Sequence, residues 1–109
     1  MATFEEFQKI EIRVGKIIDA KDFPEAKKPA YKLMIDFGEF GIKRSSAQIT
    51  AVYSKEELLG KQIVAVINFP PKKIVDFISE VLVLGVITKD NKVILLKPER
   101  EVESGDKIA

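Results

Sequence analysis

Residues 54–69 read SKEELLGKQIVAVINF, which predicts a short helix followed directly by a buried strand. Ser54 and Glu57 have the spacing of a capping box, in which two side chains satisfy free backbone N–H groups at a helix start. Gly60 suits the position just after a helix, because glycine tolerates the left-handed backbone conformation found there. One small helix over residues 54–59 is therefore expected, lying between two strands.

Alternating and continuous apolar runs predict strands on both sides of this helix. In chain order they cover residues 12–20, 31–37, 40–49, 62–69, 81–88 and 93–96. The first strand changes phase near Gly15, where a bulge or bend is expected. Short strands with one helix after the third describe an all-β fold, a five-stranded Greek-key barrel of the oligonucleotide/oligosaccharide-binding (OB) type. A small open sandwich would give a similar pattern.

The N-terminal residues predict a second helix, over about residues 3–10. It begins with a capping box at residues 3–6, and Phe4, Phe7 and Ile10 recur every three residues along it. A helix of so few turns is not stable alone, so its apolar stripe must pack on another surface. We expect these three residues to form the interface of a homodimer, the commonest closed assembly.

The whole chain of 109 residues is expected to form one domain. The N-terminal helix covers about residues 3–10, the barrel about 11–88, and a C-terminal hairpin and tail about 81–109. Its first residues lack the basic and apolar regions of a signal peptide, and no apolar run is long enough to span a bilayer. A cytoplasmic location without membrane insertion is therefore expected.

Composition argues against catalysis. The chain has no cysteine and no histidine, so the common nucleophile–base pairs cannot form. Disulfides and thiolate metal sites are excluded too. The acids form no paired motif, and there is no phosphate-cradling glycine loop or dinucleotide fingerprint. We expect a protein that is not an enzyme and that uses neither a metal nor a cofactor.

Charge is concentrated in the middle of the chain, although the net charge is only +1. Residues 21–75 contain 10 basic and 6 acidic side chains, a balance of +4, while the remainder has 8 basic and 11 acidic ones, a balance of −3. A basic middle fits a local anion-binding surface. Chance scatter over a solvated face remains an equal alternative.

Several segments together resemble the tRNA-binding domain family. They are IRVGKI (12–17), KLMIDFG (32–38), YSKEEL (53–58), GKQ (60–62) and NFPPKK (68–73). The resemblance runs from about residue 10 to residue 88. It implies the OB-type barrel that is appended to some aminoacyl-tRNA synthetases and also occurs as free-standing dimers.

Within this family, four segments are similar to the CsaA-type, export-related chaperone subgroup. They are FPEA (23–26), SSAQIT (45–50), NFPP (68–71) and SEVLVLG (79–85). Synthetase-appended members usually have Gly-Leu where this chain has Ala47-Gln48. The resemblance implies non-catalytic binding of tRNA and of unfolded or export-destined polypeptides. The alternative is a tRNA-binding module with no chaperone role.

A basic loop is the main candidate for RNA binding. Prolines 70 and 71 stiffen the chain before Lys72 and Lys73, which favours phosphate contact, although a solubilising loop tip would look the same. Arg44 shares strand parity with Ser46 and would reach the same face. The RNA-binding residues expected are Arg44, Ser46, Asn68, Lys72, Lys73 and Ser79. For Asn68, hydrogen bonding to loop backbone is an equal alternative.

Apolar residues crowd around the same loop. They are Phe69, Ile74, Phe77 and Ile78. Packing in the core is the default interpretation of such residues. The alternative is a groove that binds unfolded polypeptide, and these four residues are the candidate peptide-binding set.

Overall fold

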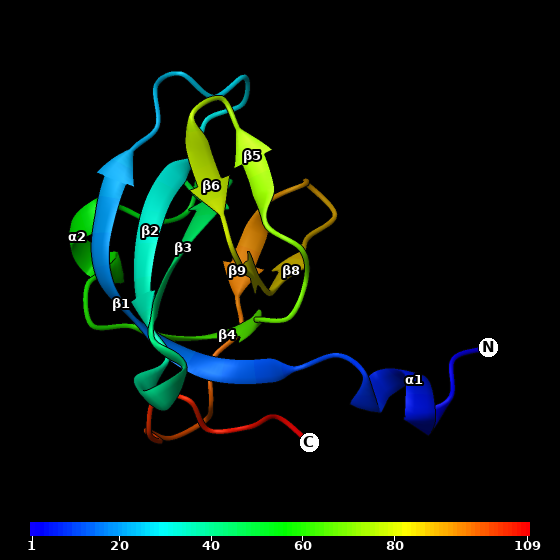
Figure 1. Ribbon diagram of the computed structural model, residues 1–109. Coiled ribbons are helices and arrows are strands. Elements are labelled where there is room, and N and C mark those ends of the chain that lie inside the picture. The colour runs from blue at the N-terminus through cyan, green and yellow to red at the C-terminus, as the bar shows by residue number, and fades with distance from the viewer.

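Five antiparallel strands form the main sheet of the computed structural model, which describes residues 1–109 (Figure 1). They are β1 (Ile12–Asp22), β2 (Tyr31–Asp36), β3 (Ile42–Ala47), β4 (Gln62–Val66) and β7 (Leu82–Val83). Their order is β3-β2-β1-β4-β7. The two outer strands approach each other, and the Ser45 hydroxyl donates a hydrogen bond to the Val81 carbonyl at 3.1 Å. The expected five-stranded OB-type barrel is confirmed.

Shorter elements surround this barrel. They are α1 (Phe4–Gln8), the 3₁₀ turn η1 (Gly38–Phe40), α2 (Lys55–Leu58), the hairpin β5 (Lys72–Ile74) with β6 (Phe77–Ser79), and the hairpin β8 (Gly85–Ile87) with β9 (Val93–Leu95). The helix α2 lies between β3 and β4 in the chain, as the capping box predicts, and the Ser54 hydroxyl accepts from the Glu57 N–H. Figure 1 shows α1 standing away from the barrel. None of the helices is long and apolar enough to cross a membrane.

The core lies inside the barrel and follows the strand alternation. Along β2, Tyr31, Leu33 and Ile35 are buried, while Lys32 and Met34 point outward. Phe37 and Leu58 close the ends of the same apolar cluster. The outward faces of β2 and β3 carry polar and charged side chains together with the exposed Met34 and Ile42, and β6 of the β5–β6 hairpin lies against β3.

Gly15 serves close packing rather than a bulge. The register of β1 against β2 shifts between Ile17 and Asp19, two residues later than expected. A Cβ atom on Gly15 would lie 2.6 Å from both Ile35 Cγ2 and Phe37 Cε1. Glycine is needed here because the core side chains occupy the space that any other residue would fill.

Several boundaries differ from the expectation. The expected strand over residues 81–88 is divided into β7, which belongs to the main sheet, and β8, which pairs only with β9. β3 begins at Ile42 rather than near residue 40, because residues 38–40 form the 3₁₀ turn between two glycines with positive φ. Lys72 and Lys73 lie in a strand, β5, and not in a loop. The turn of this hairpin places Val75 at φ 56°, a conformation that β-branched residues rarely adopt.

The C-terminal tail completes the sheet beside the first half of β1. The Val14 N–H donates to the Asp106 carbonyl at 2.9 Å, and the Gly105 N–H donates to the Val14 carbonyl at 2.7 Å. The side chain of Gln62 adds two bonds to the main chain of Val102, one donated and one accepted. The tail is therefore part of the barrel.

Candidate binding groove and basic hairpin

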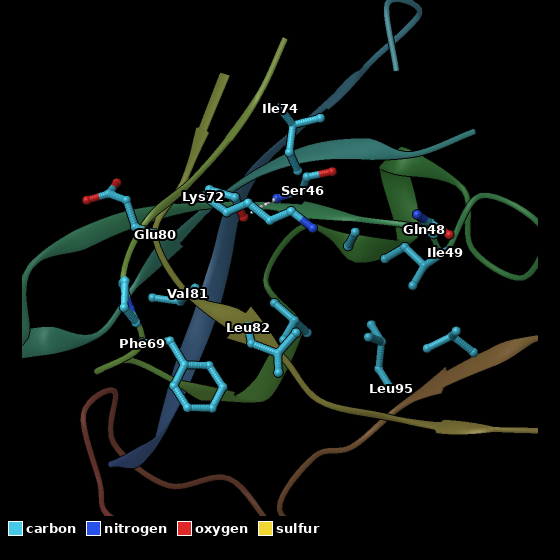
Figure 2. Close-up of a pocket in the computed structure, with 15 residues that line it drawn as sticks. Ser46, Gln48, Ile49, Phe69, Lys72, Ile74, Glu80, Val81, Leu82 and Leu95 are labelled. Atoms are coloured by element: carbon cyan, nitrogen blue, oxygen red, sulfur yellow. Dashed lines mark hydrogen bonds between the residues drawn. The ribbon is translucent and has the colours of Figure 1, made fainter. Parts of the chain in front are cut away.

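An open groove of about 420 Å³ lies where the barrel is least regularly closed, between the end of β3, the β5–β6 hairpin, β7 and β9 (Figure 2). This volume is in the range of small ligand sites. Its apolar wall consists of Ala47, Ile49, Phe69, Pro70, Ile74, Val81, Leu82, Val83, Val93 and Leu95. Its polar members are Ser46, Gln48, Lys72, Ser79 and Glu80.

Strand alternation decides which hairpin residues reach this groove. Lys72 is paired with Ser79 and Ile74 with Phe77, so these four share one face of the hairpin. Lys73 and its partner lie on the opposite face. The two neighbouring lysines therefore project to different sides of β5, and they would contact different phosphate groups rather than one.

Three hydrogen bonds fix the hairpin to the edge of β3. The Ser46 N–H donates to the Ser79 hydroxyl at 3.1 Å, a bond drawn as a dashed line in Figure 2. The Glu80 N–H donates to the Arg44 carbonyl at 2.8 Å, and the Arg44 N–H donates to a Glu80 carboxylate oxygen at 3.1 Å. Ser79 is thus a positioning residue, because its hydroxyl holds the hairpin over β3.

Rings and cations hold the far end of the hairpin. Phe77 meets Phe23 of the β1–β2 loop edge-on, with ring centroids 5.5 Å apart. The Lys32 ammonium lies 4.7 Å from the Phe23 ring centroid, and the Arg44 guanidinium lies 5.6 Å from that of Phe77. Arg44 also pairs with Glu80, Nε to Oε1 at 3.5 Å. These contacts fix the hairpin over the sheet and leave Arg44 less free to bind other anions than the two lysines.

The expected RNA-binding residues divide into three groups. Ser46, Lys72 and Ser79 line the groove, and Arg44 lies beside it. Lys73 is exposed on the other face of the hairpin. Asn68 is separate: its side-chain oxygen accepts from the Glu11 N–H at 2.8 Å, and its amide donates to the Lys9 carbonyl at 2.7 Å.

These two bonds connect Asn68 to the segment between α1 and β1. The structure thus favours the backbone-satisfying role that the sequence left open for this residue. We leave it out of the RNA-binding surface proposed below.

Only two of the four expected peptide-binding residues lie in the groove. Phe69 and Ile74 line the groove, whereas Phe77 packs on Phe23 and Ile78 lies on the opposite face of the hairpin. Sequence reasoning missed Gln48, although it shares the strand parity of Ser46. It also missed Leu95, which β9 brings to the groove from far along the chain.

The N-terminal stripe is open to solvent in the single chain. Phe4 is 71% exposed, and no residue of α1 is buried. Exposed apolar side chains also cover the β8–β9 hairpin, among them Val86, Ile87 and Ile94. These surfaces are available for association.

The shifted pKa values lie outside the groove. The pKa of Lys55 is raised, mainly by the hydrogen bond that its ammonium donates to Asp22 at 2.9 Å. The pKa of Asp90 is lowered, mainly by the hydrogen bond from the Thr88 hydroxyl.

A five-stranded barrel with an aliphatic groove and a basic hairpin defines a class of small ligand-binding modules. Residues 12–107 match the family described as "Putative tRNA binding domain". The chain belongs to this tRNA-binding domain family, as its motifs indicate.

Two solved structures show a more specific similarity, to CsaA chaperones. The crystal structure of the chaperone CsaA from Bacillus anthracis is 52% identical, with a TM-score of 0.96, and the match covers 100% of this chain and 99% of that one. The CsaA chaperone from Picrophilus torridus is 61% identical, with a TM-score of 0.94, over 100% of both chains. The resemblance to the CsaA-type subgroup is confirmed.

Curated relatives include much longer proteins. Methionine–tRNA ligases from Thermococcus onnurineus and Pyrococcus horikoshii are 37% and 39% identical over 105 residues, or 96% of this chain. The chain spans only 14% of the length of either ligase. The CsaA chaperones are matched over almost their whole length, and so is a MetRS related protein from Pyrococcus horikoshii, which is 30% identical, with a TM-score of 0.89, over 100% of this chain and 98% of that one. The ligases share one domain with this chain.

Proposed function

We propose that this protein is a cytoplasmic, non-catalytic chaperone of the tRNA-binding domain family. It binds unfolded, export-destined polypeptide in the groove and tRNA on the basic hairpin. The observation that carries this proposal is the aliphatic groove of about 420 Å³ beside exposed ammonium groups. Binding of an apolar side chain in this groove is favourable by about 25 cal/mol for each Å² of apolar surface that is removed from water.

The open shape of the groove suits a chaperone. Aliphatic walls accept many apolar side chains without demanding one sequence, because hydrophobic attraction is not directional. The likeness to CsaA chaperones over the full chain supports the same function.

A tRNA-binding module without chaperone activity is the second candidate. The shared domain of the methionine–tRNA ligases favours it. The two differ in their response to salt: phosphate contacts weaken steeply as salt rises, whereas hydrophobic binding holds or strengthens.

Ile74→Asp is expected to remove most of the protection that the protein gives a denatured client against aggregation. The substitution puts a charge on the apolar wall of the groove, which must then be desolvated when a client binds. Light scattering of an aggregating client measures the effect. Ile42→Asp is the matched control, because Ile42 is 55% exposed on β3 and does not line the groove.

Equal protection by wild type and Ile74→Asp would remove Ile74 from the binding site. Absence of protection by the wild type would remove the chaperone function. Both variants are compared at matched stability, measured by thermal unfolding.

A homodimer is expected, because a small barrel leaves the α1 stripe and the β8–β9 surface uncovered. Sedimentation equilibrium should give twice the chain mass of 12.3 kDa. Phe4→Asp combined with Phe7→Asp should shift the protein toward the monomer, since two charges would enter the apolar interface. A wild-type monomer at tens of micromolar, a working range that we choose as typical for such associations, would contradict this.

A further inference from the structure

Three polar side chains of the groove have no hydrogen-bond partner within the protein: the Ser46 hydroxyl, the Gln48 amide and the Lys72 ammonium. Glu80, the only acid in the groove wall, is paired with Arg44. The groove therefore carries one uncompensated positive charge. In Figure 2 the Lys72 side chain extends away from Glu80, with its amine end directed toward the side on which Gln48 lies.

The edge of β3 that borders the groove has one residue whose main-chain N–H and C=O groups form no hydrogen bond. Arg44 and Ser46 are occupied by the hairpin at this edge. Gln48, two residues further on, forms no hydrogen bond through its main chain. After it, the Ile49 carbonyl accepts from the N–H groups of Val52 and Tyr53, and the chain turns into a loop. The free edge is thus one residue long.

We infer that the groove binds the C-terminal end of an apolar polypeptide, with the terminal carboxylate on Lys72. This inference rests on the proposed polypeptide-binding function and names its ligand. The Gln48 and Ser46 side chains supply further donors to the carboxylate, and the last apolar side chains lie among Ile49, Ile74 and Leu95. Lys72 is then the residue that determines specificity.

Two features favour a chain end over an internal segment or a nucleotide. Pairing with an internal strand needs a row of free edge groups, and this edge offers the groups of one residue. Binding of an unpaired base relies on stacking against aromatic rings or guanidinium planes. Phe69 is the single ring in the wall, and the Arg44 guanidinium faces Phe77.

The test uses three short, fluorescently labelled peptides with the same apolar sequence. One ends in a free carboxylate, the second in an amide, and the third in an amide with one internal glutamate. Fluorescence anisotropy gives the Kd of each. The free acid is expected to bind wild type up to about fivefold more tightly than the amide, because Lys72 is exposed and an ion pair with an exposed lysine contributes no more than that.

Lys72→Met should abolish this preference, so that the free acid binds no more tightly than the amide. Lys73→Met is the matched control, since Lys73 lies next in sequence but on the other face of β5, and it should keep the preference. Equal binding of acid and amide to wild type would overturn the inference while leaving polypeptide binding intact. A preference that survives in Lys72→Met would overturn the role of Lys72.

Two further outcomes separate the remaining alternatives. Tight binding of the internal-glutamate amide would show that the groove selects acidic side chains and would overturn the assignment to a chain end. Displacement of the acid peptide by adenosine monophosphate at similar concentration would assign the groove to a nucleotide. If none of the three peptides binds, the proposed polypeptide function itself fails.

Discussion

Reversing both Lys72 and Lys73 to glutamate is expected to abolish tRNA binding at low salt, a loss of at least about 100-fold. Each protomer would lose two cations and gain two anions at the hairpin, and phosphate attraction dominates such affinities. The reversal acts through the summed field, so it does not require both ammonium groups to touch RNA. We propose that Lys72, Lys73 and Arg44 contact the RNA backbone, with Ser46 beside them and Ser79 holding the hairpin in place.

The salt dependence tests the same contacts. Three phosphate contacts per protomer make about six in a dimer, which predicts a slope of log affinity against log salt of roughly −4 to −5. Lys72→Ala should flatten this slope by about one to two units without changing which RNA is preferred. The measurement is a titration of mixed tRNA at several salt concentrations.

A control variant makes this test specific. Lys89→Glu combined with Lys97→Glu gives the same change in net charge outside the hairpin and should retain most of the affinity. Equal binding by wild type and the hairpin reversal would show that the RNA site lies elsewhere. The reversal at Lys72 and Lys73 should not change the oligomeric state, because it touches neither the α1 stripe nor the β8–β9 surface. Sedimentation equilibrium checks that the control variant has the same oligomeric state, because Lys89 and Lys97 flank β8 and β9.

Gly15→Ala is expected to lower the free energy of unfolding by about 3 kcal/mol, at the upper end of the range for overpacking. The added methyl group would overlap Ile35 and Phe37, two fully buried side chains. The barrel cannot shift them easily, because core side chains are already close-packed. Urea unfolding followed by circular dichroism measures the change.

Gly60→Ala separates this overlap from backbone strain. Gly60 has a φ of +82° but no atom near its Cβ position, so its substitution should cost only about 1 kcal/mol through strain. Phe37→Leu in the Gly15→Ala background should recover part of the loss, because it vacates the space beside the new methyl group. Additive losses in the double variant would show that the two residues do not compete for space.

Local patterns predicted most of the barrel. The capping box of α1 is complete, and at α2 the Ser54 hydroxyl caps the helix without the reciprocal bond from its own N–H to Glu57. Alternation placed Leu33 and Ile35 inside and Arg44 outside. Such features depend on residues close together in the chain. The sequence therefore indicates them without knowledge of the fold.

The site was less predictable, because it depends on pairing between distant segments. Lys72 and Lys73 were expected to act from one loop, and their separation onto two faces follows from a three-residue strand that only its partner reveals. Leu95 reaches the groove through the β8–β9 hairpin. The role of Asn68 could not be predicted from neighbouring residues either, because its hydrogen-bond partners at Lys9 and Glu11 lie far away in sequence.

The pairing of the tail with β1 has a consequence for folding during synthesis. Main-chain bonds join Val14 to Gly105 and Asp106, and Ile12 to Ile108, so the first strand meets its last partner across nearly the whole chain. Such non-local contacts slow folding, because a long loop must close before they form. During synthesis on the ribosome, one edge of the N-terminal half of β1 stays unpaired until residues 105–108 leave the exit tunnel. The completed barrel therefore forms only after the tail has been released.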